Sequence, residues 1–301
     1  MYLSRLILNA RNAQVRRDLA NCHDLHRTIL RGFPDLSADA TAAGKPLAVA
    51  GNAVGDVRAR LGVLFRLETD GRSGAARVLV QSHVAPDWGR LPAGYVLDTG
   101  GSVANPDQKF VGEAFAAIRA GDELVFRLRA NPTKRLRPET GPDGVRRDGK
   151  RVELRTEEEL LVWFKEKGDG NPATGRPGAG FRLLTVQARP GLAVGVRGGS
   201  DGGGRGENED RRFGGDGAGT APEAVSDARA RSVGKVTGSA LRSNGDGRGA
   251  ATRRMLTFGD VVFDGRLLVT DAELFGQTLV RGIGSGKAFG FGLLSVARSR
   301  G

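Results

Sequence analysis

The sequence predicts an α+β protein whose two halves share one order of elements, and three observations lead to this fold class. Short stretches of alternating apolar and polar residues, typical of half-buried strands, recur along the chain. Segments with apolar residues at helical spacing lie between them. With two polar interruptions set aside, the order strand, helix, strand, strand, helix, strand occurs twice. This order is typical of ferredoxin-like (RRM-like) domains, so we expect two in tandem, the second with a disordered glycine-rich insertion.

The first half is expected to form an N-terminal domain over residues 1–135. Residues 2–9 alternate like a strand, and residues 18–32 are expected to be helical because apolar side chains recur there at helical spacing. Two strands are expected next, over residues 63–68 and 77–83. A helix over residues 107–120 and a closing strand, "ELVFRLRA", over residues 123–130 should follow.

A basic linker over residues 136–150 is expected to separate this domain from a second one over residues 151–301. The linker belongs to the proline-containing stretch "NPTKRLRPETGPDGVRRDGKR". A strand over residues 151–155 should open the second domain. Thr156 and Glu159 then have the spacing of a capping box, so a helix is expected to begin there.

The rest of the second domain is expected to alternate strands with one more helix. It begins with a strand over residues 181–188 and continues with a strand–turn–strand unit, "MLTFGDVVFDGRLLVTD", over residues 255–271. A helix over residues 271–281 and a closing strand over residues 292–297 complete it. Residues 191–252 are rich in Gly, Asp, Arg and Ser. Such a composition buries too little apolar surface to fold, so we expect a disordered insertion.

Charge and cysteine content limit the partners and the compartment. The 301 residues contain 46 Lys and Arg against 34 Asp and Glu, and this net charge of +12 favours an anionic partner: nucleic acid, an acidic lipid surface or an acidic protein. A single cysteine, Cys22, excludes an internal disulfide and suits a reducing compartment. No long hydrophobic segment occurs, so a cytoplasmic protein is expected.

Two of the three histidines, His23 and His26, lie three residues apart in "ANCHDLHRTILR", next to Arg27 and Arg31. On a helix, residues three apart share one face, so both imidazoles would stand in a basic environment. The pair is compatible with proton transfer, with a metal site or with an ordinary surface. Tetrahedral zinc sites take three or four protein ligands, and no further ligand at a recognisable spacing is present, so no metal is expected.

A glycine-rich segment, "VRGIGSGKAFGFGLLSVAR", lies near the end of the chain. Its glycines allow the main chain to approach another backbone or a phosphate, and Lys287 adds a cation. Ala288 follows the lysine where a Walker loop has Ser or Thr. A tightly packed turn and a phosphate contact both remain open. The glycines concerned are Gly282, Gly284, Gly286, Gly290 and Gly292.

Five ordered motifs together resemble the CasE family, the CRISPR repeat-processing endoribonucleases of type I-E (Cascade) systems. The motifs are "MYLSRLILN", "RRDLANCHDLHRT", "FRLRANPTKR", the expected hairpin "FDGRLLVTD" and "GIGSGKAFGFGLLSVA". The resemblance covers both ends and the centre of the chain and implies two ferredoxin-like domains. It also implies metal-independent cleavage of CRISPR precursor RNA at the base of the repeat hairpin, without a cofactor. The products would carry a 2′,3′-cyclic phosphate and a 5′-hydroxyl.

The resemblance also implies partners and site residues. The mature guide RNA would stay bound, with other Cascade subunits as partners and no membrane. His26 matches the catalytic histidine of the family. His23 stands where members often carry tyrosine, so it either replaces that residue in proton transfer or only binds and orients RNA. Charge and position, apart from the resemblance, give the expected RNA-binding residues: Arg27, Arg31, Arg127, Arg129, Asn131, Lys134, Arg135 and Lys287. For Arg27 and Arg31 a solvated helix face is an equally open interpretation.

Two alternatives without catalysis remain. One is a hairpin-RNA-binding subunit of the same ribonucleoprotein that is weakly active or inactive, for which the changed residue at position 23 is the motive. The other is an RRM-type binding module, although such sheets usually carry aromatic stacking motifs and none is found here.

Overall fold

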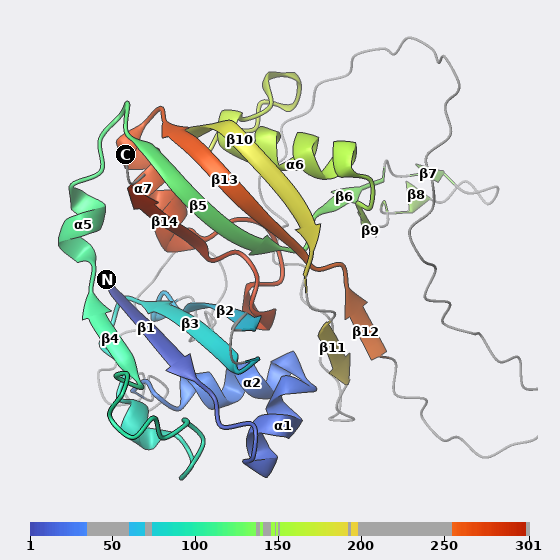
Figure 1. Cartoon of the computed structure of the whole chain (residues 1–301). Helices are drawn as coiled ribbons and strands as arrows, with labels where there is room; N and C mark the ends of the chain where they lie inside the picture. Colours follow the sequence, from blue (N-terminus) through green and yellow to red (C-terminus); the bar gives the residue numbers. More distant parts are fainter. Residues whose placement is uncertain are drawn as a thin grey trace, which may run out of the picture. The chain divides into compact units, whose positions relative to one another are not determined.

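The computed structural model describes residues 1–34, 60–69, 74–136, 139–140, 146–147, 149, 151–191, 194–197 and 255–298. They belong to one compact unit made of Met1–Arg197 and Met255–Gly301. This unit is a mixed α/β structure with two four-stranded antiparallel sheets and shorter two-stranded ladders (Figure 1). Most of the expected insertion, residues 191–252, lies outside the described residues.

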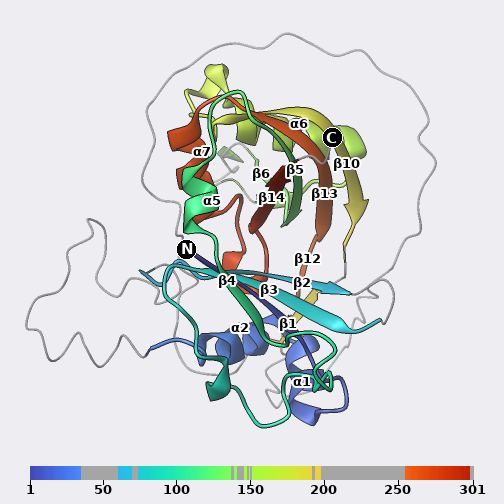
Figure 2. The same ribbon diagram turned by 60° about the vertical axis from the view of Figure 1, so that its left-hand side comes forward.

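The first sheet is built from the first part of the chain and has the strand order β2-β3-β1-β4. Two helices lie together against one face of it (Figure 2). Their apolar residues pack with the inward side chains of the strands, including Phe65, Val78 and Val80. The elements are β1 (Tyr2–Ile7), α1 (Ala13–Leu19), α2 (Cys22–Leu30), β2 (Leu64–Thr69), β3 (Ala76–Ser82) and β4 (Asp107–Phe110).

The helix expected over residues 18–32 is divided into two helices. The Asn12 side chain caps α1, and the Asn21 side chain accepts a hydrogen bond from the His23 backbone N–H at the start of α2. An asparagine at this position satisfies a backbone donor that has no partner inside the helix. A new helix therefore begins at Cys22, one turn before His26.

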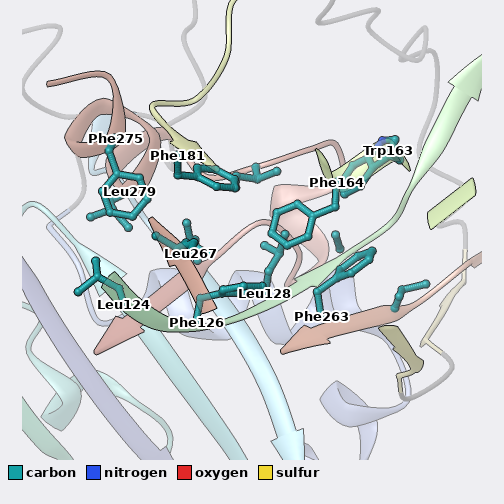
Figure 3. Close-up of a cluster of buried hydrophobic side chains, with 14 of the residues drawn as sticks. Leu124, Phe126, Leu128, Trp163, Phe164, Phe181, Phe263, Leu267, Phe275 and Leu279 are labelled. Carbon is teal, nitrogen blue, oxygen red and sulfur yellow. The ribbon is translucent and has the colours of Figure 1, made fainter. Parts of the chain in front are cut away.

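The second sheet has the strand order β10-β13-β5-β14. Two helices cover the face that carries Leu124, Phe126 and Leu128, and an aromatic cluster fills the space between the helices and the sheet (Figure 3). Phe164 lies in this cluster, with its ring centre 4.9 Å from that of Phe263. The elements are β5 (Glu123–Ala130), α6 (Glu157–Asp169), β10 (Phe181–Pro190), β13 (Val261–Val269), α7 (Ala272–Arg281) and β14 (Leu294–Arg298).

Residues 123–130 form a strand, as expected, but this strand belongs to the second sheet and does not close the first half. It is β5, which pairs with β13 and β14 inside the second sheet. The strand that completes the first sheet is β4, within the segment expected to be a helix, and only α5 (Gly112–Ala116) is helical there. Alternation identifies a strand but not its partners, and this explains the error.

The basic stretch after β5 folds back on itself instead of linking two domains. β6 (Thr133–Arg135) pairs with β9 (Arg151–Glu153), and β7 (Glu139–Thr140) pairs with β8 (Arg146–Arg147). The strand expected to open the second domain, residues 151–155, is therefore part of a local ladder. The chain instead passes from the first sheet to the second through residues 111–122.

Residues 255–271 contain two strands, as expected, but the two do not pair with each other as a hairpin. β12 (Met255–Phe258) pairs with β11 (Val194–Arg197), while β13 runs without a turn through Asp264 and Gly265. By contrast, the capped start of α6 is confirmed, since the Thr156 side chain accepts a hydrogen bond from the Glu159 backbone N–H. Within the described part of the chain, no helix combines the length and apolar character needed to cross a bilayer.

Candidate functional site

The two neighbouring histidines lie on α2 in different environments. Leu25 and Ile29 bury one face of the helix in the core of the first half. His26, next to Leu25, is 7% exposed and stacks on Phe65 of β2, with ring centres 5.9 Å apart and planes 13° from parallel. His23, one turn earlier, is exposed. The helix thus carries a buried, stacked imidazole at His26 and a solvent-accessible imidazole at His23, one turn apart on the same face.

The glycine-rich segment after α7 packs against this helix. Its short 3-10 helix η3 (Lys287–Phe289) contacts α2 and β2. Gly290 has φ +83°, and a Cβ atom there would lie 3.0 Å from Cε2 of Phe65, the ring on which His26 stacks. A Cβ on Gly292 would lie 2.8 Å from the Ile283 carbonyl oxygen. The tightly packed turn is therefore confirmed.

The base of the glycine-rich segment is attached to β5. The Gly292 backbone N–H donates to the Arg129 carbonyl at 2.8 Å, and Asn131 bridges to Ser285. Asn131 is buried, 6% exposed, so it serves this attachment and does not present its side chain on the surface. Lys287 is partly buried within η3.

Arg129 does not have the exposed position expected of an RNA contact. Its side chain is 2% exposed, and Nε donates to both oxygens of Asp260 at 3.0 and 2.8 Å. The guanidinium lies 5.2 Å from the centre of the Phe291 ring. Burial raises the pKa of Asp260, against the opposing effect of Arg129. Burial also raises the pKa of Cys22, at the start of α2, to about 11, while the positive charge of Arg129 acts to lower this pKa.

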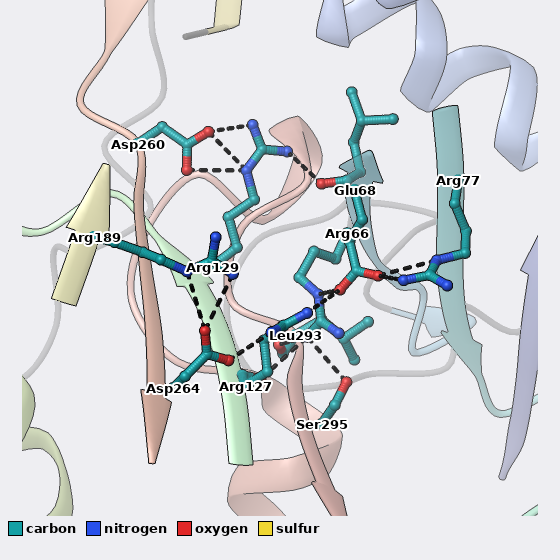
Figure 4. A network of polar contacts seen from close by, with 11 residues as sticks. Arg66, Glu68, Arg77, Arg127, Arg129, Arg189, Asp260, Asp264, Leu293 and Ser295 are labelled. Carbon is teal, nitrogen blue, oxygen red and sulfur yellow. Dashed lines mark hydrogen bonds and ion pairs between the residues drawn. The ribbon is translucent and has the colours of Figure 1, made fainter. Parts of the chain in front are cut away.

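Arg127 lies on the same side of β5 as Arg129 and belongs to a charged network (Figure 4). Its Nε donates to Asp264 at 2.6 Å, and its Nη1 lies 3.8 Å from Glu68. Burial raises the pKa of Glu68, but the pairs with Arg66 and Arg77, both at 2.7 Å, hold it below its ordinary value.

Arg66 fixes the first sheet to the part of the glycine-rich segment that leads into and forms β14. It is 4% exposed, and its Nη1 donates to the Leu293 carbonyl at 3.2 Å and to Ser295 Oγ at 2.9 Å. Burial lowers the pKa of Arg66, while Glu68 opposes this change. The sequence pattern does not single out Arg66, Glu68 or Asp260, because charged residues in or beside short strands look like ordinary solvent-facing positions.

The remaining expected RNA-binding residues fall into two groups. Arg27 on α2 and Arg31, which caps its C-terminal end, are exposed, and Arg27 lies 4.0 Å from Asp24 with its side chain 71% exposed. Lys134 and Arg135 lie on the β6–β9 ladder, where Lys134 pairs with Glu159 at 2.7 Å. The structure therefore groups the two histidines with the α2 arginines and the glycine-rich segment.

This grouping has the parts needed for proton transfer at a phosphate. Imidazole exchanges protons near neutral pH, and arginine or lysine can stabilise negative charge that develops on phosphate oxygens. Across the residues that the structure describes, no three His, Cys, Asp or Glu side chains form a group suited to a metal ion.

Comparisons with known proteins extend over the whole chain. The model of a family described as CRISPR associated protein matches residues 1–298. The CRISPR-associated endoribonuclease Cse3 of Thermus thermophilus is 30% identical over 297 residues, covering 99% of this chain and 100% of the relative.

Solved structures give the same result. A structure of CRISPR endoribonuclease Cse3 bound to a 19-nucleotide RNA superposes with a TM-score of 0.61 at 30% identity, covering 99% of this chain and 100% of that chain. A second, of Thermus thermophilus Cse3 bound to an RNA representing a pre-cleavage complex, gives a TM-score of 0.57 at 28% identity and covers 98% of both chains.

Proposed function

The chain belongs to the family of CRISPR-associated proteins, and from this we propose that it is an endoribonuclease that cuts CRISPR precursor RNA at the base of the repeat hairpin. One observation carries the proposal: a CRISPR-associated endoribonuclease is 30% identical over essentially the full length of both proteins. The pairing of a histidine-bearing helix with a closely packed glycine-rich segment supports it.

The proposed reaction is an internal transfer within the RNA. The 2′-oxygen attacks the adjacent phosphorus, the bond from phosphorus to the 5′-oxygen breaks, and a 2′,3′-cyclic phosphate and a 5′-hydroxyl result. One group takes the proton of the 2′-hydroxyl and another gives a proton to the leaving oxygen. The nucleophile belongs to the substrate and imidazoles suit both transfers, so the reaction requires no metal or cofactor.

His26 is the proposed catalytic residue, with His23 as its proton-transfer partner. The stacking on Phe65 supports a fixed role for His26, and the exposure of His23 supports direct access to RNA. A role of His23 in RNA orientation alone is the competing assignment. Arg27, exposed on the same helix, and Arg31, exposed at its C-cap, are the proposed phosphate contacts nearest the histidines. Lys134, Arg135 and Lys287 are proposed further contacts.

The two sheets are proposed to be the cores of two ferredoxin-like domains. Their strand orders, β2-β3-β1-β4 and β10-β13-β5-β14, are the same when each set of four strands is numbered along the chain. The helices α6 and α7 complete the βαββαβ order of the second set. Because β5 belongs to the second set, we place the proposed domain boundary in the segment 111–122, before β5, and not at residue 135.

The product guide RNA is proposed to stay bound, as part of a cytoplasmic Cascade complex. Hairpin affinity comes mostly from phosphate contacts and helix shape, which cleavage at the base of the hairpin leaves largely in place. An inactive RNA-binding subunit is the competing function, and it predicts binding without cleavage.

The test is cleavage of the protein's own repeat RNA in the presence of EDTA. We expect cleavage to persist with a chelator and to stop when the nucleotide before the cut carries 2′-deoxyribose, because that change removes the nucleophile. His26→Ala should abolish cutting while hairpin affinity stays within about threefold, since affinity depends mainly on phosphates. An intact RNA that binds tightly to the parent protein would instead support the inactive subunit.

A further inference from the structure

The aromatic ring beneath His26 has a role that core packing alone does not describe. Phe65 of β2 is fully buried, 0% exposed, and its ring lies nearly parallel to the imidazole of His26, with the planes 13° apart. A flat ring against an imidazole limits the angles at which that imidazole can rotate. Phe65 therefore restricts the orientation of the proposed catalytic side chain.

The same ring contacts the glycine-rich segment. A Cβ atom on Gly290 would meet Cε2, Cδ2 and Cζ of Phe65 at 3.0, 3.4 and 3.5 Å, and the φ of +83° there also favours glycine. This close approach leaves the Phe65 ring little room to move. A side chain at position 290 would therefore crowd the Phe65 ring in its place next to the histidine.

The next residue fixes the strand that carries Phe65. Successive residues of a strand point to opposite faces, so Phe65 enters the core while Arg66 points away from it. Arg66 donates to the carbonyl of Leu293 and to Ser295, which lie just after the last glycine of the glycine-rich segment. The backbone of Phe65 is therefore held in a defined place relative to both His26 and the glycine-rich segment.

From these contacts we infer that Phe65 is a positioning residue, which holds the His26 imidazole at the angle required for proton transfer and aligns it with the glycine-rich segment. The inference rests on the proposed function of His26. A misplaced catalytic group slows the chemical step while RNA binding is unaffected, because binding depends on phosphate contacts elsewhere.

The experiment compares Phe65→Leu with a matched variant, Phe33→Leu. Phe33 is buried in the same core, 2% exposed, and its aromatic contact is with Trp88. Both changes remove one buried aromatic ring, so both lower stability. Single-turnover cleavage is measured at a temperature where both variants are folded. We expect Phe65→Leu to cut roughly tenfold or more slowly than Phe33→Leu, with hairpin affinities equal within about twofold.

A spectroscopic measurement separates orientation from stability. The chain has only three histidines, so His26→Ala identifies the His26 ring signals in an NMR spectrum. Loss of the stacked ring should shift these signals in Phe65→Leu and leave them in place in Phe33→Leu. Equal cleavage by both variants together with unchanged His26 signals would overturn the positioning role.

The two proposals fail separately. The NMR measurement uses no RNA, so it tests the hold of Phe65 on His26 independently of the function. A His26→Ala variant that cuts at the parental rate would refute the proposed function of His26, and with it the catalytic consequence of the stacking. Normal loss of activity in His26→Ala with no effect of Phe65→Leu would refute the positioning role alone.

Discussion

Arg129 and Asp260 form an ion pair in which each side chain is 2% exposed, and this pair joins the end of β5 to the residue before β13. Two charges held away from water stabilise a protein only while both are present. The neighbouring ring of Phe291 connects the same guanidinium to the glycine-rich segment. The pair therefore serves the fold around the site, although the sequence had suggested that Arg129 contacts RNA.

Replacement of one partner of this pair should destabilise the protein strongly. Arg129→Met leaves the Asp260 carboxylate buried without its cation, and we expect a loss of about 3–5 kcal/mol in the free energy of unfolding. The double variant Arg129→Met with Asp260→Leu should recover most of that loss. Urea unfolding measures both. Arg189→Met is the control, because Arg189 is 57% exposed in its pair with Asp264, and it should cost at most about 1 kcal/mol.

The stability of the protein should depend on Glu68 in acid. The folded-state pKa of Glu68 lies below its ordinary value, which is about 4.3. The folded state thus binds this proton less tightly than the unfolded chain. The contribution of Glu68 is present above about pH 4.3 and is lost as the pH falls through the lower, folded-state pKa.

Glu68→Gln should therefore lower the melting temperature at pH 7, and the difference from the parent protein should shrink as the pH falls below about 4. Thermal melts across pH check this. Glu113→Gln, at an exposed position of α5, should follow the parent throughout. A Glu68→Gln difference that is constant with pH would show that the network does not depend on the charge of Glu68.

The pH dependence of cleavage should show whether His23 transfers a proton. If His23 and His26 act as base and acid, the rate is bell-shaped, because one imidazole must be neutral and the other charged. His23→Ala should remove one side of the profile and slow cleavage by roughly a hundredfold. His23→Tyr should keep substantial activity and move that side to higher pH, since a phenol titrates near 10. A parental rate and profile in His23→Ala would leave His23 with RNA orientation only.

The single thiol reports on the packing at the start of α2. With the pKa of Cys22 raised to about 11 by burial, little thiolate forms at pH 8. Iodoacetamide should react roughly two hundredfold more slowly with the folded protein than with a free cysteine of pKa about 8.5. Alkylation followed by mass spectrometry, with and without denaturant, measures this. A rapid reaction without denaturant would show that the N-terminal turn of α2 opens.

A shortened chain should keep its fold and activity. Arg197 on β11 is the register partner of Met255 on β12, so the two ends of segment 198–254 already meet in an antiparallel ladder. An Asn-Gly turn is suited to such a connection. Replacement of residues 198–254 by Asn-Gly should change the melting temperature and cleavage rate little. A loss of folded protein would show that the segment makes contacts the fold needs.

Much of the fold is visible in local patterns of the sequence. The alternation in β1 and β5 and the capping spacing at Thr156 each indicate an element found in the structure. The partner of a strand is a different matter. β5 looks like the closing strand of the first half, because its apolar residues suit either sheet and only tertiary packing selects one.

Part of the candidate site was also predictable. The spacing of His23 and His26 on one helix is confirmed, and so is the close packing of the glycine-rich segment. In "LFRLET", however, Arg66 and Glu68 alternate with apolar residues, so the strand face that carries them looks exposed to solvent. Arg66 is buried and Glu68 partly buried because residues of β5 and β14 lie against them, and no local pattern shows a contact between segments so far apart.

The central place of β5 also has a consequence for synthesis on the ribosome. Arg127 and its strand partner Asp264 are 137 residues apart in the chain. A nascent chain therefore carries β5 with both edges unpaired until β13 and then β14 emerge, long after the first sheet has all four of its strands. Unpaired strand edges invite association with other chains. Newly made protein is thus most vulnerable to aggregation late in translation, and a chaperone that shields β5 would act in that interval.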